Sequence, residues 1–222
     1  SGGVYDAKLN NTGDTVIYRG ERDSGGWAEL YKASVANPAV ATKLNVTKDG
    51  GEGNFVGDVG NYAISHDDKN VLYSVALPNT YGFSLQTVNL AAPSGSTQLS
   101  HANDNVYADW WLSKDDKTVL YRSDVGVDDV LRSVSVAAPG VATTVSAPID
   151  GGEGYVSDFA VSGDEKHVVY RLGGNGADSW LEPGLQLDIN PFSEGASLHT
   201  VALSTPGVGV QIATTQSGQG IY

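Results

Sequence analysis

The sequence predicts an all-β fold built from four repeated units. The first observation is a tyrosine that follows a polar turn and two apolar residues. It occurs four times, at spacings of 55, 48 and 49 residues: Tyr18, Tyr73, Tyr121 and Tyr170. The second observation is that short β-branched and aromatic runs alternate with Gly, Pro, Asn, Asp and Ser, as strands alternate with turns. A repeat near fifty residues with strand-like content indicates a propeller or an array.

Each unit contains four short predicted strands. The first precedes the turn, at residues 5–9, 61–64, 109–112 and 158–161, and the second ends near the tyrosine. The third strand is marked by a second repeat position: Leu30, Leu85, Leu131 and Leu198. The fourth is marked by a third repeat position, always 14 residues later: Leu44, Leu99, Val145 and Ile212. Four strands in about fifty residues form one propeller blade, so we predict an all-β β-propeller of four-stranded antiparallel blades, four of them in this chain.

The turns carry a recognisable pattern. Three of them begin with serine and have aspartate two residues later: Ser65-His66-Asp67-Asp68, Ser113-Lys114-Asp115-Asp116 and Ser162-Gly163-Asp164-Glu165. They resemble the TolB-type propeller repeat, whose turn reads Ser-Pro-Asp-Gly before a Val-x-Tyr strand. The proline and the glycine are missing here, and the first copy keeps only a Gly-Asp pair shifted by one, Gly13-Asp14. The resemblance covers nearly the whole chain and implies the fold. It does not select a function, because such blades occur in translocation factors, peptidase accessory domains, lyases and surface proteins.

The repeat predicts one domain over residues 1–222, with units at about 3–52, 53–101, 102–153 and 154–222. An insertion at about 173–195 lengthens the fourth unit. Insertions in repeat folds often map to the binding face, so we interpret it as a lid, a protomer contact or a docking arm. The alternative is a loop that folds back on its own blade. The end of the chain, 218–222, matches 152–156, which leads into a first strand. We therefore expect either closure of four blades or further blades elsewhere.

Composition limits the classes of function that the sequence allows. The 26 acidic residues outnumber 13 basic ones and give a net charge of −13, which makes nucleic acid an unfavourable partner. The lack of cysteine excludes disulfides and thiol catalysis. No apolar run reaches 18 residues, so we expect no transmembrane segment. The absence of methionine indicates that the chain does not start at a native initiator. We expect a protein that is secreted, periplasmic or on the surface of a bacterium.

A possible metal site follows from the repeat. Four polar residues lie four positions before the turns: Asp6, Asn61, Asp109 and Asp158. In a propeller the first strand of each blade lines the central channel, so equivalent positions would converge on one axis. Oxygen ligands from several directions suit Ca²⁺, the one cofactor that the sequence suggests. The alternative is that each side chain bonds the backbone of its own blade.

The remaining candidates form a binding surface. We predict that four aromatic residues contact a protein partner or a glycan: Trp27, Trp111, Trp180 and Phe192. The alternative for such rings is packing between blades. No Gly-x-Ser-x-Gly elbow or histidine pair with metal-ligand spacing is present, so no catalytic residue is assigned. We predict a non-catalytic module for protein interaction, scaffolding or self-assembly. The alternative is an accessory propeller of a polysaccharide-active enzyme or a peptidase that binds a cation or a glycan.

Overall fold

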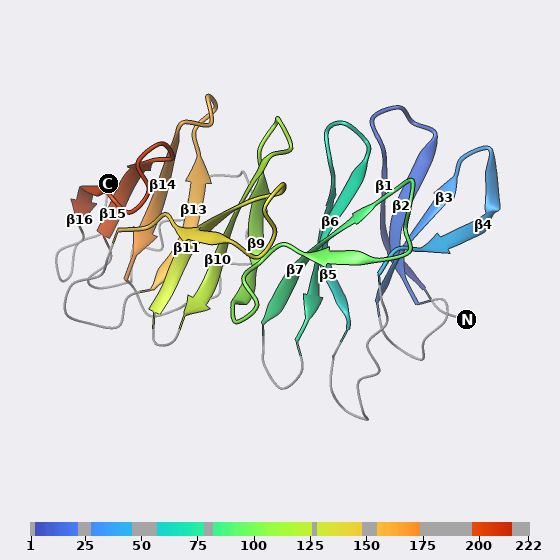
Figure 1. Ribbon diagram of the computed structural model, residues 1–222, viewed down its shortest axis with the longest axis horizontal. Coiled ribbons are helices and arrows are strands. Elements are labelled where there is room, and N and C mark those ends of the chain that lie inside the picture. The colour runs from blue at the N-terminus through green and yellow to red at the C-terminus, as the bar shows by residue number, and fades with distance from the viewer. Residues whose placement is uncertain are drawn as a thin grey trace.

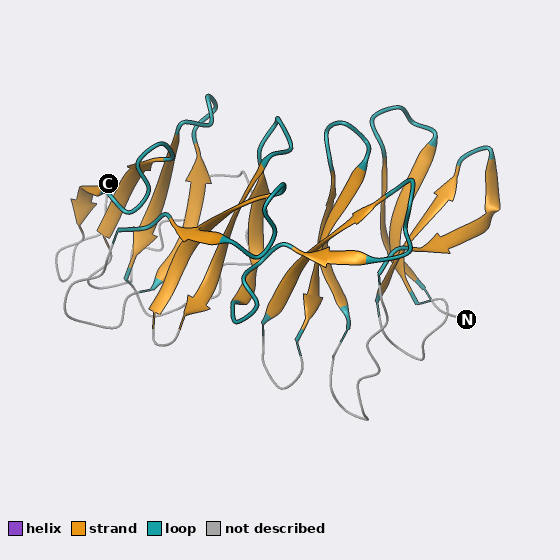
Figure 2. Cartoon of the chain, in the orientation of Figure 1, coloured by secondary structure: helices purple, strands orange, loops and turns teal. Residues whose placement is uncertain are grey.

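All regular secondary structure in the described residues is β-strand (Figure 2). The computed structural model describes residues 3–21, 28–45, 57–77, 82–125, 128–147, 155–173 and 197–214. Within these ranges no helix is long and apolar enough to cross a membrane. The prediction of an all-β chain is confirmed.

The sixteen strands of the described residues fall into four units of four. Unit 1 contains β1 (Val4–Leu9), β2 (Thr15–Gly20), β3 (Glu29–Ser34) and β4 (Asn37–Lys43). Unit 2 contains β5 (Val59–Ile64), β6 (Asn70–Ala76), β7 (Phe83–Asn89) and β8 (Ser96–Gln98). Unit 3 contains β9 (Asn105–Leu112), β10 (Thr118–Val125), β11 (Asp128–Ser135) and β12 (Ala142–Thr144). Unit 4 contains β13 (Val156–Val161), β14 (His167–Leu172), β15 (Ser197–Ala202) and β16 (Gly209–Thr214).

Within every unit the strands pair antiparallel in chain order. Units 1 and 4 are separate four-stranded sheets, whereas units 2 and 3 are joined into one sheet by a single pair, Phe83 with Val106. The units follow one another in a row, with unit 1 at one end and unit 4 at the other (Figure 1). The four turns between the first and second strands lie along the same edge of this row (Figure 1).

The third repeat position lies just outside the strand that it was expected to mark. Leu44, Leu99 and Val145 each follow their unit's last strand directly, and each N–H donates to the carbonyl of the second repeat position 2.7–2.8 Å away. In unit 4 the regular step of 14 residues breaks down. A register shift makes Leu198 pair with Ala213, so Ile212 sits at an irregularity in β16.

The apolar core lies between consecutive units rather than within them. One face of each unit, the forward face, presents three apolar residues to the next unit. In units 1 to 3 they are Ile17, Leu30 and Leu44; Leu72, Leu85 and Leu99; and Leu120, Leu131 and Val145. The backward face of the next unit meets them with Val71, Tyr73 and Val88; Val119, Tyr121 and Val134; and Val168, Tyr170 and Val201. Each junction therefore depends on two neighbouring repeats.

The repeated tyrosine belongs to these backward faces. Tyr73, Tyr121 and Tyr170 are almost fully buried, and burial raises the pKa of each hydroxyl. The Tyr170 hydroxyl accepts a bond of 2.9 Å from the N–H of Ala147 in unit 3. A buried ring with a polar tip needs such a partner. The junction thus explains why tyrosine recurs at this position.

The forward face of unit 4 differs from the other three. Val169 and Leu198 are only partly buried, although their equivalents in units 1 to 3 are at most 1% exposed. In the adjoining strand β16, Val210 is 62% and Ile212 54% exposed. In the part of the chain that the structure describes, this face has no following unit to cover it.

A first prediction compares the same repeat position in two environments. Leu131→Ala should lower the free energy of unfolding by about 3 kcal/mol, because it empties a fully buried site. Leu198→Ala should cost about 1 kcal/mol or less, because that side chain already contacts water. Urea denaturation of both variants measures the difference. Equal losses would show that unit 4 is covered as the other units are.

Candidate functional site

The four predicted ring positions lie on the first strands of the units. Asp6, Asn61, Asp109 and Asp158 occupy β1, β5, β9 and β13. Each of the three aspartates has an arginine partner 13 residues later, on the adjacent second strand. Arg19 Nη2 lies 2.7 Å from Asp6 Oδ2, Arg122 Nε lies 2.6 Å from Asp109 Oδ2, and Arg171 Nε lies 3.4 Å from Asp158 Oδ1.

Two of these arginines reach across to the following unit. Arg19 Nη1 donates to the carbonyl of Gly60 at 2.7 Å, and Arg122 Nη1 donates to the carbonyl of Val156 at 2.8 Å. Unit 2 uses an amide for the same purpose, because Asn61 Nδ2 donates to the carbonyl of Ala108 at 3.0 Å. Charge-assisted hydrogen bonds to Asp6 and Asp109 hold these two arginines in place. These positions therefore link the first strands of consecutive units.

This geometry bears on the calcium hypothesis. A guanidinium already neutralises each carboxylate, and a cation would have to compete with it. In the ranges that the structure describes, no three His, Cys, Asp or Glu side chains form a group that could hold a metal ion. The Ca²⁺ ring of Asp6, Asn61, Asp109 and Asp158 stays a prediction.

The arginine partners were missed by sequence reasoning, although a signal was present. Arginine directly follows the repeated tyrosine in three units: Arg19, Arg122 and Arg171. In unit 2, where the ring residue is asparagine, the equivalent position is Ser74. Units with aspartate at the ring position therefore have arginine after the tyrosine, whereas the unit with asparagine has serine there. Pairing of the first and second strands brings these positions together.

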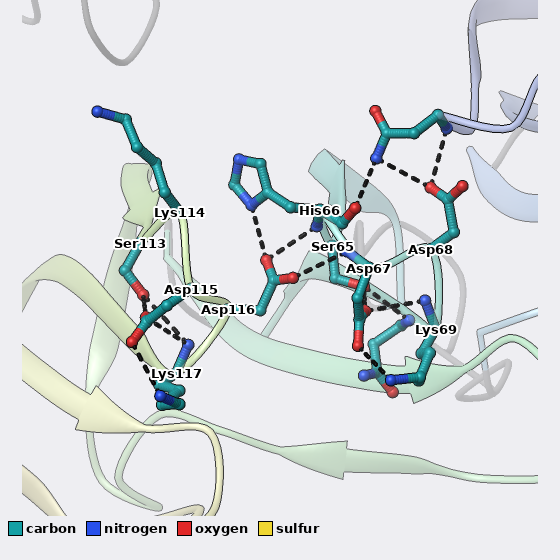
Figure 3. Close-up of polar contacts among 12 residues, drawn as sticks. Ser65, His66, Asp67, Asp68, Lys69, Ser113, Lys114, Asp115, Asp116 and Lys117 are labelled. Atoms are coloured by element: carbon teal, nitrogen blue, oxygen red, sulfur yellow. Dashed lines mark hydrogen bonds and ion pairs between the residues drawn. The ribbon is translucent and has the colours of Figure 1, made fainter.

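The turns form a second constellation. In unit 2 the Ser65 hydroxyl donates to Asp67 Oδ1 at 2.7 Å and accepts from the N–H of Asn70 at 2.9 Å (Figure 3). Ser113 and Asp115 repeat the first of these bonds at 2.7 Å. Serine and aspartate thus close each turn on itself, which is the local reason for their recurrence.

The fourth residue of each turn adopts a left-handed backbone. Asp68, Asp116 and Glu165 have φ values of 58°, 59° and 58°, a conformation that favours glycine but that aspartate tolerates better than most residues. Gly13 has φ 74° at the equivalent place in unit 1, since its N–H bonds Asn10 as that of Asp68 bonds Ser65. Gly13 is therefore the fourth residue of the first turn, in register with Asp68, Asp116 and Glu165.

The acidic side chains at these positions bind the turn of the preceding unit. Asp116 accepts bonds of 2.9 and 3.0 Å from the N–H groups of His66 and Asp67 (Figure 3). Asp68 does the same, at 2.9 Å each, for Asn11 and Thr12. We call this contact the turn clamp. Both of its hydrogen bonds are charge-assisted, which makes them stronger than neutral ones.

The third clamp is longer. Glu165 accepts from the N–H of Lys114 with both carboxylate oxygens, each 3.2 Å away. The Lys114 ammonium adds a bond of 2.9 Å to the carbonyl of Gly163. The turns of units 1 to 3 are therefore each clamped by the unit that follows, which connects the four turns in one direction.

The carboxylates inside the turns are held ionised. Hydrogen bonds from the Lys69 ammonium, the Ser65 hydroxyl and the Lys69 N–H lower the pKa of Asp67 to about 2. Side-chain hydrogen bonds, led by Ser113 and Ser162, lower the pKa of Asp115 and Asp164 as well. These groups stay charged at any ordinary pH, so the turn network persists there.

A buried acidic group was also missed. Asp104 is 3% exposed, accepts from the Tyr121 hydroxyl at 2.7 Å and forms an ion pair with Arg132. It connects the tyrosine of unit 3 to the loop that follows unit 2. Its partners satisfy the carboxylate, so we assign it a structural role.

Of the predicted aromatic surface, the structure describes one member. Trp111 is partly buried and packs against the core between units 3 and 4, while Trp110 is buried between units 2 and 3. Trp27, Trp180 and Phe192, with most of the insertion at 173–195, lie outside the described residues. A glycan or protein contact through these four residues stays a prediction.

Comparison with known proteins identifies the fold. No family model and no curated protein matches the sequence. Among similar solved structures are TolB from Acinetobacter baumannii (TM-score 0.50, 12% identity) and a putative TolB from Agrobacterium tumefaciens (0.52, 14%). Another comes from a structural and mechanistic study of two prolyl endopeptidases (0.59, 12%).

The matches cover 96%, 97% and 97% of this chain but only 44%, 66% and 30% of those structures. At such low identity the likeness shows the fold alone. The chain therefore has a TolB-like β-propeller fold and spans two thirds or less of the proteins that it resembles.

A second prediction concerns pH. Ser65→Ala removes a hydrogen bond to Asp67, so the carboxyl pKa should rise from about 2 toward its ordinary value of 3.8. A lowered pKa stabilises the fold above about pH 4, and this contribution disappears as pH falls toward 2. The variant's loss of stability should therefore be largest above pH 4. NMR titration of the carboxyl group checks this, and Ser113→Ala, which should leave Asp67 unchanged, is the control.

A third prediction tests the turn clamp. Asp116→Gly removes the carboxylate but keeps a residue that suits the left-handed backbone. Amide exchange at His66 and Asp67 should accelerate about tenfold, while Asn11 and Thr12 stay protected. Asp68→Gly should give the reverse pattern, so each variant controls the other. Uniform acceleration at both turns would contradict a local clamp.

Proposed function

We propose that this chain provides four blades of a TolB-like propeller that acts, without catalysis, as a protein-interaction and assembly module. One observation carries this proposal: the forward face of unit 4 leaves Val169 and Leu198 partly exposed, although every preceding unit buries the same positions. An apolar face that the fold covers three times and leaves open once is typical of a surface for protein contact.

Other observations agree with this proposal. The opposite end also exposes apolar side chains, with Val4 65% and Leu9 60% exposed in β1. The turn clamps and the arginines of two Asp–Arg pairs connect units to each other. The net charge of −13 disfavours nucleic acid as the partner. Likeness to TolB from two bacteria supports a secreted, periplasmic or surface location in a bacterium.

An accessory propeller of a peptidase is the second candidate. It is favoured by the similarity to a prolyl endopeptidase structure, of which this chain covers 30%. In that case a catalytic domain would belong to the same polypeptide, and the blades would position or restrict its substrate. The two candidate functions differ in whether the native particle has peptidase activity.

The fourth prediction is the state of the protein in its native source. Denaturing mass spectrometry gives the polypeptide mass, and light scattering gives the mass of the folded particle. We expect one or both to exceed 23.1 kDa, because an open apolar face favours further blades or a partner. A native monomer of 23.1 kDa would contradict an assembly role. Peptidase activity of the native particle would favour the second candidate.

A further inference from the structure

We infer that the forward face of unit 4 binds a further repeat unit whose turn carries Asp or Glu at the left-handed position. This inference rests on the proposed function and specifies the partner. Its first basis is that all three described junctions share one plan. In each, an acidic residue of the later unit accepts hydrogen bonds from the turn of the earlier one. Asp68 and Asp116 each accept from two N–H groups, and Glu165 accepts from one.

The turn of unit 4 is built like the turns that receive a clamp. Ser162 Oγ donates to Asp164 Oδ1 at 2.7 Å, and the N–H of Glu165 donates to the carbonyl of Ser162 at 2.8 Å. The N–H groups of Gly163 and Asp164 therefore occupy the places of His66 and Asp67. Among the described residues no group accepts a hydrogen bond from either of them.

The space beside this donor pair is also open. A Cβ atom added to Gly163 would meet no heavy atom within 4 Å. Two adjacent N–H groups that have no acceptor among the described residues suit a carboxylate, which can accept one bond on each oxygen. Asp116 shows the result in the same fold, with both oxygens in use.

The apolar positions support the same partner independently. Val169 and Leu198 occupy the places that Leu120 and Leu131 fill in unit 3, where both are fully buried against unit 4. A following unit would cover them with its own β-branched and tyrosine residues. The polar and apolar parts of the junction are therefore both incomplete on one side of unit 4.

The left-handed residues of the four turns argue against a second copy of these units as the partner. The end of another copy that is free to dock is unit 1, and its left-handed residue is Gly13. Glycine has no carboxylate to offer to Gly163 and Asp164. The left-handed acidic residues of units 2 to 4 already clamp the units before them. The partner is thus a repeat unit outside residues 1–222.

A backbone contact between units predicts one more residue of the partner. Gly140 of unit 3 donates to the carbonyl of Leu99 at 2.9 Å, and Gly207 of unit 4 donates to the carbonyl of Val145 at 3.0 Å. Both glycines have positive φ, 78° and 80°. We expect the partner to carry a glycine of this conformation before its fourth strand.

The first test uses the unmodified chain. Residue-resolved amide exchange should be about tenfold faster at Gly163 and Asp164 than at His66 and Asp67, because only the latter pair is clamped. Slow exchange at Gly163 and Asp164 in the monomer would overturn the inference. So would protection that rises with protein concentration, because the partner would then be a second copy.

The second test supplies the partner. A copy of residues 102–147 is fused after Tyr222, either unchanged or with the copied aspartate changed as in Asp116→Gly. We expect the unchanged fusion to slow exchange at Gly163 and Asp164 about tenfold and the glycine version to leave it fast. Equal protection in both versions would overturn the role of the carboxylate.

The two proposals can fail separately. Denaturation of each fusion with Leu198→Ala shows whether that side chain becomes buried, since the loss of stability should then rise toward that of Leu131→Ala. A larger loss of stability without protection of Gly163 and Asp164 would contradict the predicted clamp but would still support an interaction role for the face. No rise in either fusion would overturn the inference, and the native mass would still decide the proposed function.

Discussion

Burial of apolar side chains between consecutive units is the interaction on which the rest of this structure depends. In units 1 to 3 the three forward residues pack against the backward residues of the next unit, so the described core is shared between units. Removal of this apolar surface from water is the main stabilising contribution in such a repeat. It requires consecutive units to keep the same spacing and orientation, and the polar contacts described above act within that constraint.

The polar contacts determine how two neighbouring units align. On one edge the turn clamps join Asp68, Asp116 and Glu165 to the preceding turns. On the first strands, Arg19 and Arg122 extend from their aspartates to the backbone of the next unit. Hydrogen bonds are directional, whereas apolar contact is not. Together they favour one relative position of the units over other ways of covering the same apolar face.

The departures from the Ser-Pro-Asp-Gly pattern now have a physical reason. Glycine is the residue that suits the left-handed fourth position, and unit 1 retains it as Gly13. Units 2 to 4 accept some backbone strain there, because Asp68, Asp116 and Glu165 add a contact to the preceding unit that glycine cannot make. Among the described residues no turn comes before that of unit 1. The distribution of glycine and acid therefore follows the order of the units.

The sequence by itself determined the all-β class and the four-strand repeat, because apolar periodicity and turn chemistry are local properties. It did not reveal the partners of Asp6 and Asp109, since the pairs with Arg19 and Arg122 form only when two strands align. Nor did it show that Asp116 reaches another turn, 50 residues away from His66. Tertiary structure decided these contacts and left Leu198 uncovered, because contacts between units depend on how whole units pack.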